Sequence, residues 1–199
     1  GKPLWYADEL DADDNPTSKR VTTSDYASAD YYYVNKSSLP KVYGGFNTSL
    51  SWKGFDLSAI FAYSIGGYIY NRDITMILHN GSLEGRAWST EILRRWTPDN
   101  RYTDVPALST TSNNWNSAST RFLQNNSYMR LKNLTLSYNL PKPWVSKLAL
   151  SSVQVYVQGD NLFTIHKNQG LDPEQGITGI TYYRYPAMRT ISGGINIAF

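Results

Sequence analysis

Acidic and polar side chains near the start of the chain have part of the spacing of a calcium-binding loop. Asp11, Asp13 and Asn15 fall at positions 1, 3 and 5 of such a loop. Its sixth position should be glycine but is Pro16, and its twelfth should be glutamate but is Thr22. These departures favour a polar loop over a calcium site.

Other signatures of chemistry are missing. His79 and His166 are far apart in the sequence, and neither lies in a zinc-binding or catalytic pattern. We expect both to be solvated loop residues. The sequence contains no cysteine and no G-x-S-x-G, P-loop or dinucleotide-binding motif. It therefore predicts neither an enzyme nor a protein with a cofactor or a metal.

The composition points to β structure. The 199 residues include 16 Tyr, 6 Trp and 14 Gly, and 18% of them are charged. The net charge of +3 without a stripe of Lys or Arg argues against a nucleic-acid partner. No apolar run approaches the roughly 18 residues of a membrane helix, which leaves membrane-spanning strands open. The chain begins at Gly1 without Met or a signal peptide, so we expect a mature or truncated piece.

The most regular stretch is a predicted β-hairpin over 41–66. Lys53 and Gly54 form its two-residue turn, in which glycine supplies a positive φ. This turn would place a matching set of residues on one face of both strands. The predicted pairs are Trp52 with Phe55, Leu50 with Leu57, Thr48 with Ala59, Phe46 with Phe61 and Val42 with Ile65. A slip of one residue would destroy the match, so the register is well specified.

Three further strands are predicted, as a pair over 127–163 and a final strand over 188–199. Each alternates apolar residues with small or polar ones. Arg130 and Lys132 interrupt the first of them, because they share the face of Leu134. Either a bulge shifts the phase there, or these cations lie at an interface.

The remaining segments are expected to be loops, namely 1–40, 67–126 and 164–187. Within the second, Trp88, Ile92 and Trp96 have fourfold spacing before Pro98, which indicates a short helix. The connection over 140–151, by contrast, is short.

About five long strands with alternately short and long connections are typical of an outer-membrane β-barrel. Trp52, Phe55 and Phe199 would then form an aromatic girdle at the short-turn, periplasmic end. The long loops would be extracellular, and their aromatic residues could contact substrate or partner, or only pack the loops. These residues are Trp88, Trp96, Trp115, Tyr182, Tyr183 and Tyr185. A soluble, secreted β-sandwich that binds carbohydrate remains the alternative.

Four short motifs occur together in one order: "SYMRLKNLTLSY", "GDNLFT", "GLDPE" and a final "YP-x-x-RT". In these, the stretch over about 40–199 resembles the C-terminal end of SusC/RagA-type TonB-dependent transporters of Bacteroidetes outer membranes. The resemblance implies an all-β fold, a transmembrane antiparallel barrel of about 22 strands with a plug domain inside. The chain would be a fragment of about five of those strands.

The resemblance also implies a function and partners. Such transporters import oligosaccharides or peptides with energy delivered by TonB, and a SusD-type surface lipoprotein caps the extracellular mouth. The missing barrel strands, the plug and membrane lipid would be the other partners. Phe199 would be the terminal residue that the assembly machinery reads. A structural barrel without transport is a third reading.

Overall fold

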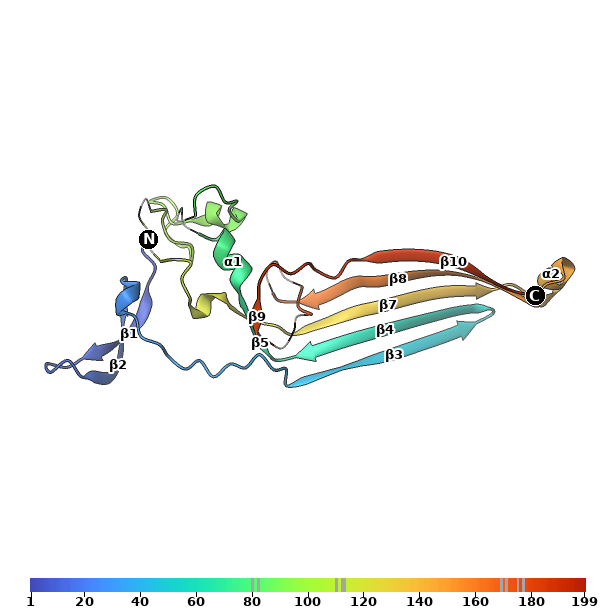
Figure 1. The fold of residues 1–199 in the computed structure, drawn as a ribbon, viewed down its shortest axis with the longest axis horizontal. Helices are drawn as coiled ribbons and strands as arrows, with labels where there is room; N and C mark the ends of the chain where they lie inside the picture. Colours follow the sequence, from blue (N-terminus) through green and yellow to red (C-terminus); the bar gives the residue numbers. More distant parts are fainter. Residues whose placement is uncertain are drawn as a thin grey trace. The chain divides into compact units, whose positions relative to one another are not determined.

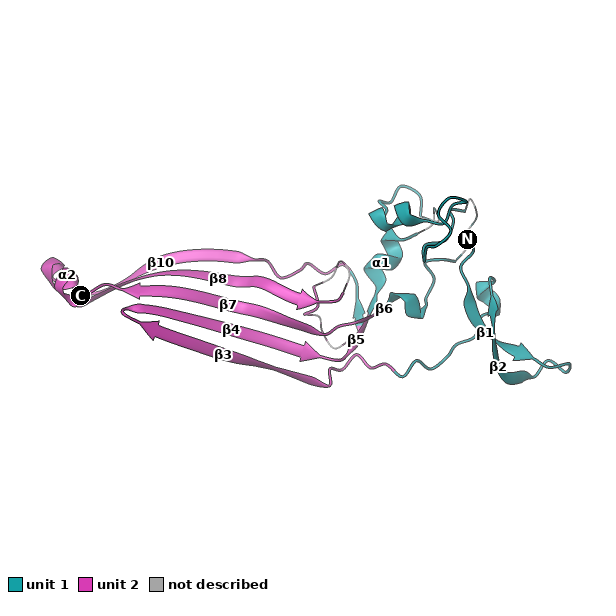
Figure 2. Cartoon of the chain, turned by 180° about the vertical axis from the view of Figure 1, so that it is seen from behind, with its two compact units in different colours: residues 1–35, 70–123, 180–182 teal, residues 36–69, 124–179, 183–199 magenta. Residues whose placement is uncertain are grey.

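The computed structural model describes residues 1–79, 81, 83–109, 111, 114–168, 170, 172–174, 176 and 178–199. The chain divides into two compact units, coloured in Figure 2, and each is described by itself. Unit 1 contains residues 1–35, 70–123 and 180–182, and unit 2 contains residues 36–69, 124–179 and 183–199.

Unit 2 is built on one antiparallel sheet of five long strands, in the order β10-β8-β7-β4-β3 (Figure 1). The strands are β3 (Val42–Trp52), β4 (Phe55–Ile65), β7 (Tyr128–Asn139), β8 (Ser152–His166) and β10 (Thr190–Ala198). All five predicted strands are therefore present. The loop expected from residue 164 begins later, because β8 continues to His166.

The predicted hairpin register is confirmed at every position. Trp52 pairs with Phe55 across the turn, and the ladder continues without a shift to Val42 and Ile65. Lys53 has φ 49° and Gly54 has φ 89°, so both turn residues occupy the left-handed region. This is the backbone of a type I′ turn, whose twist matches that of the strands.

The irregularity expected near Arg130 and Lys132 is a β-bulge. In the pairing with β4, the register shifts between Ile60 and Phe61, which face Asn133 and Leu131 on β7. Lys132 is thus the extra residue on β7. Because the bulge inserts one residue, Leu131 before it and Leu134 after it point to the same apolar face of the sheet.

The connection between β7 and β8 is short, as expected, and contains two single turns of helix. These are α2 (Lys142–Val145) and the 3₁₀ turn Ser146–Leu148. Both lie at the same end of the sheet as the β3–β4 turn (Figure 1).

Unit 1 has more regular structure than the sequence indicated. Residues 1–40, expected to be a loop, include an antiparallel hairpin of β1 (Trp5–Leu10) and β2 (Pro16–Thr23), followed by the 3₁₀ turn Tyr26–Ser28. The sequence did not predict β1 and β2, because apolar and polar residues alternate over too few positions in them.

The segment 67–126 also contains regular elements. It begins with β5 (Tyr68–Asn71) and α1 (Arg72–Ile77) and ends with the 3₁₀ turn Thr120–Phe122 and β6 (Leu123–Asn125). β5 pairs in parallel with β9 (Ile180–Thr181). The short helix expected around Ile92 is a 3₁₀ turn, Thr90–Arg94, with Ile92 buried. No helix in the described ranges is both long and apolar enough to cross a bilayer.

Candidate functional site

One face of the five-stranded sheet is apolar and exposed. Leu57 on β4, Leu136 on β7 and Val157 on β8 form one row across the sheet. Their exposed fractions are 39%, 42% and 48%, although all three are central rather than edge positions. Aromatic rings lie on the same face: Phe46 stacks on Phe61 with centroids 4.7 Å apart. Exposed aliphatic and aromatic side chains in such number mark a surface that contacts lipid or another apolar partner.

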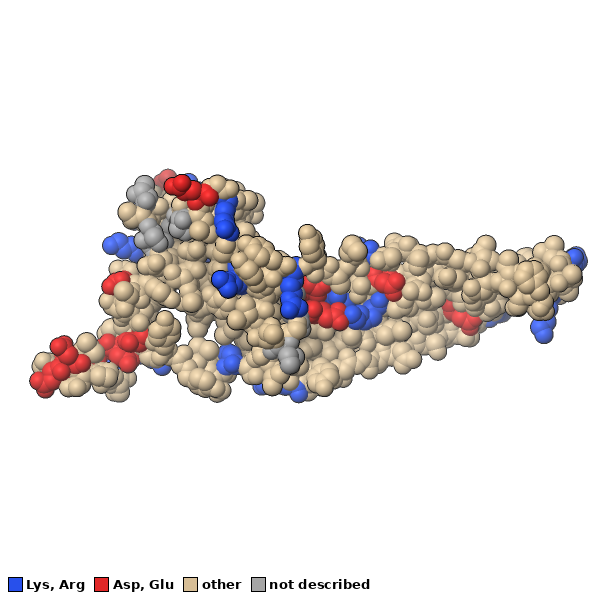
Figure 3. Space-filling view, in the orientation of Figure 1, with Lys and Arg blue, Asp and Glu red and all other residues tan. Residues whose placement is uncertain are grey.

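The opposite face is polar, and its side chains hydrogen-bond to one another across the strands. Near the turn, Asp56 accepts from Ser51 Oγ at 2.5 Å and from Asn139 Nδ2 at 2.7 Å. Further along, Asn133 Nδ2 donates to Asp160 Oδ1 at 2.8 Å, and Gln158 donates to the same carboxylate. In the view of Figure 3, the charged side chains over the sheet gather mainly at its loop end, and most of its length is uncharged.

The three residues predicted for an aromatic girdle lie at the same end of this sheet. Trp52 and Phe55 flank the β3–β4 turn, and Phe199 follows the last residue of β10. Their exposed fractions are 64%, 44% and 92%. Phe55 also packs on Tyr138 of β7, with ring centroids 4.4 Å apart.

A buried ion cluster lies on the polar face at the other end. Arg130 is 3% exposed and donates from Nε to Thr164 Oγ1 at 2.9 Å. Its two Nη atoms bind Asp172 and Glu174, the latter at 2.8 Å. Lys132 Nζ lies 2.7 Å from both oxygens of Glu174. The two cations that broke the strand pattern therefore meet the two acids of the "GLDPE" motif, and of the two alternatives for them the bulge is confirmed.

The tryptophans expected as contact residues are largely packing residues of unit 1. Trp115 is 7% exposed and forms a small core with Ile92 and Val105. Arg121 covers its ring at 3.8 Å. Trp115 is therefore buried within unit 1. Trp96 is half-buried and donates its backbone N–H to Val105 at 2.8 Å.

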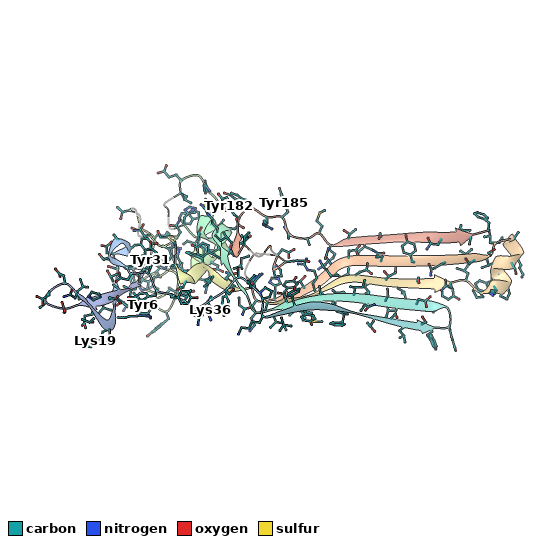
Figure 4. All side chains as sticks on the ribbon, turned by 60° about the horizontal axis from the view of Figure 1, so that its bottom comes forward. Tyr6, Lys19, Tyr31, Lys36, Tyr182 and Tyr185 are labelled. Carbon is teal, nitrogen blue, oxygen red and sulfur yellow. The ribbon has the colours of Figure 1, made fainter. Side chains whose placement is uncertain are left out.

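The loop tyrosines are more accessible. Tyr182 is 42% exposed and its ring lies 4.7 Å from the Arg72 guanidinium, whereas Tyr183 is 65% exposed. Tyr185 is 98% exposed and projects from the chain (Figure 4). Other exposed tyrosines escaped the sequence reasoning, among them Tyr6 and Tyr31, which are labelled in Figure 4. The run "YYYV" in a polar segment was the available signal for Tyr31.

Both histidines were expected to be solvated loop residues, but one is exposed at the end of a strand and the other is buried. His166 is exposed, at the end of β8. His79 is fully buried: its Nδ1 accepts from Leu83 N–H at 3.3 Å, and Trp88, which is 41% exposed, packs edge-on against its ring. The edge-on contact between the two rings thus holds both side chains in place.

The carboxylate at the start of the calcium-like spacing belongs to a turn. Asp11 Oδ1 accepts the backbone N–H groups of Asp13 and Asn15, both at 2.9 Å. These bonds close the β1–β2 hairpin and explain the spacing without a metal.

Relatives among known proteins are TonB-dependent receptors. The chain is 37% identical over 167 residues to TonB-dependent receptor P3 of Formosa agariphila, covering 78% of this chain and 16% of the relative. It is 31% identical to receptor P26 of the same organism, covering 86% and 18%. TonB-dependent receptor SusC of Bacteroides thetaiotaomicron is 27% identical, covering 84% and 16%. No family model matches the chain.

Solved structures agree. The RagAB peptide importer in its closed-closed state is 36% identical with a TM-score of 0.80, covering all of this chain and 21% of that one. The open-open state gives 35% and 0.81 with the same coverage. This chain therefore spans between about a sixth and about a fifth of the length of the proteins that it matches. On sequence and fold together, it belongs to the SusC/RagA-type family of TonB-dependent receptors.

Proposed function

We propose that the chain forms the C-terminal five strands of the outer-membrane barrel of an active importer. The single observation that carries the proposal is the division of the sheet into an exposed apolar face and a hydrogen-bonded polar face. In a barrel wall the first faces lipid and the second faces the lumen. The alternative of a β-sandwich fits less well, because the five long strands share one sheet instead of dividing between two.

In the whole protein, other segments supply the remaining barrel strands and the plug domain. The barrel has about 22 strands around a plug domain, TonB supplies energy through the plug, and a SusD-type lipoprotein covers the outer mouth. Residues 1–40, 67–126 and 164–187 are its extracellular loops. Trp52, Phe55 and Phe199 form the periplasmic girdle, and Phe199 serves as the assembly signal. The imported molecule is an oligosaccharide or a peptide, moved without covalent chemistry.

A matched pair of substitutions on neighbouring residues of β4 tests the two faces. Leu57 lies on the apolar face and Ser58 on the polar one. In the full-length transporter, Leu57→Lys should lower the folded, heat-modifiable band in outer-membrane fractions. A lysine on the lipid face costs about 2–4 kcal/mol at mid-bilayer and less toward the interface, so at Leu57, two residues from the girdle residue Phe55, the cost lies below that range. Ser58→Lys should leave that band near wild type, and equal loss from both would contradict the assignment of faces.

Import is tested separately in cells. Uptake of a labelled oligosaccharide pool and of a labelled peptide pool is compared with and without TonB. Accumulation of one pool that disappears without TonB supports an importer and identifies its substrate class. A folded protein that accumulates neither pool would contradict the transport function.

A further inference from the structure

The segment between β8 and β10 is closed at its base by one carboxylate. Asp172 Oδ2 accepts the backbone N–H of Ala187, fifteen positions later, at 2.6 Å. Asp172 Oδ1 accepts the N–H of Glu174 at 2.9 Å. A second bond supports the same base, because Asn161 Nδ2 on β8 donates to Met188 C=O at 3.1 Å. These bonds therefore tie the chain at Asp172 to the chain at Ala187 and Met188.

Arg130 fixes this base to the sheet. Each of its guanidinium nitrogens has an oxygen partner, on Thr164, Glu174 and Asp172 respectively. The side chains of Arg130 and Asp172 are 3% and 7% exposed. A buried charge that loses its partner is strongly unfavourable, so neither residue can release the other without rearrangement. Lysine could not replace Arg130, since it lacks the planar fork that serves three acceptors.

The electrostatics of Asp172 favour the closed arrangement. Burial alone would raise the pKa of this carboxyl. The N–H groups of Ala187 and Glu174, together with Arg130, nevertheless hold its pKa below the ordinary value. The ionised form, which the base requires, is therefore the stable one at neutral pH.

Just before Ala187 in the sequence, the chain carries exposed aromatic rings. Tyr183 and Tyr185 are 65% and 98% exposed, and Arg184 between them is also exposed. Tyr183 has φ 49°, a tight backbone conformation that a non-glycine residue adopts only when its surroundings hold it. Rigid aromatic side chains on a fixed base contact a ligand at low entropic cost.

We propose that Arg130 and Asp172 form a clasp that positions Tyr183 and Tyr185 for contact with the transported molecule. The clasp rests on the polar face of the sheet, so this role depends on the proposed function, in which that face lines the lumen. Both clasp residues are positioning residues, and the tyrosines make the contact.

The experiment uses the full-length transporter with a nitroxide spin label on Arg184→Cys, which leaves both tyrosines in place. Because Arg184 is exposed, electron paramagnetic resonance should report a label of intermediate mobility, as expected for an exposed side chain on a fixed backbone. Asp172→Asn should convert it to a mobile one, and Glu174→Gln, which alters a half-exposed partner, should cause a smaller change in the same direction. The matched control is Asp56→Asn, which removes another hydrogen-bonded carboxylate from the polar face and should leave the label unchanged.

Uptake of the imported pool supplies the second measurement. Without the label, Asp172→Asn should raise the KM of import several-fold while the maximal rate and the heat-modifiable band stay near wild type. An unchanged label in both Asp172→Asn and Glu174→Gln would overturn the clasp. A mobile label with an unchanged KM would overturn its role in ligand contact. If the wild-type protein imports neither pool, the transport function fails, while the label still decides whether the clasp exists.

Discussion

At the scale of residues, the polar side chains of this chain act mainly as local ties. Asp11 is an example, because its carboxylate serves two backbone N–H groups in the turn of the β1–β2 hairpin. The N–H groups of Asn15 and Asp13 hold the pKa of the Asp11 carboxyl below its ordinary value. The calcium-like spacing is thus a by-product of turn chemistry, in which aspartate and asparagine are favoured.

Removing this tie should loosen the hairpin. Asp11→Ala should speed amide exchange over residues 5–23 of the full-length protein, because two turn N–H groups lose their acceptor. Asp13→Ala is the control, since Asp13 takes part in the turn through its backbone. Because the folded pKa is lowered, the stabilisation is present at neutral pH and is lost as the pH falls through that value. Equal exchange in both variants at pH 7, measured by mass spectrometry, would contradict this role.

At the scale of elements, the long strands could be predicted and the long-range contacts could not. Period-2 alternation and the Lys53-Gly54 turn are local signals, and they specified the register from the Val42–Ile65 pair to the Trp52–Phe55 pair. The bulge was visible as a break in phase at Arg130. Its partner Asp172, 42 positions away, was not visible, because no local pattern encodes an ion pair between distant segments.

The same reasoning explains why the sequence did not separate buried from exposed aromatic residues in the loops. Trp115 lies in the more polar stretch of sequence, yet it is 7% exposed whereas Tyr185 is 98% exposed. Burial of an aromatic residue in an irregular segment depends on which other segments return to cover it. Here Ile92 and Val105 cover Trp115.

The β3–β4 turn offers a prediction at this scale. Gly54 has φ 89°, and a Cβ there would lie 3.0 Å from the carbonyl oxygen of Asn139. Gly54→Ala should destabilise the folded protein by about 1–2 kcal/mol, the cost of a left-handed conformation for an L-residue. Lys53→Asn is the control, because asparagine tolerates this region and should be neutral or stabilising. Urea unfolding of the full-length protein in detergent measures both, and an unchanged midpoint for Gly54→Ala would count against the turn.

At the scale of the whole molecule, the sheet of unit 2 has two long, unprotected edges. Neither β3 (Val42–Trp52) nor β10 (Thr190–Ala198) contains a charged residue or a proline. Soluble proteins usually protect such edges with charges, prolines or covering segments. Unprotected edges are consistent with strands that continue into a larger sheet, and the chain spans only about a fifth of the proteins that it resembles.

The 199-residue chain by itself should therefore associate in water. Both the free edges and the apolar face of the sheet would drive association, and a charged residue on the edge separates the two causes. Ser49 lies on the polar face of β3, so Ser49→Lys adds a charge to the edge without touching the apolar face. Analytical ultracentrifugation should find large assemblies of the wild-type chain without detergent. Ser49→Lys should reduce their size, and detergent should dissolve what remains by covering the apolar face. A monodisperse wild-type monomer in water would contradict both the edge argument and the membrane-facing assignment of the apolar surface.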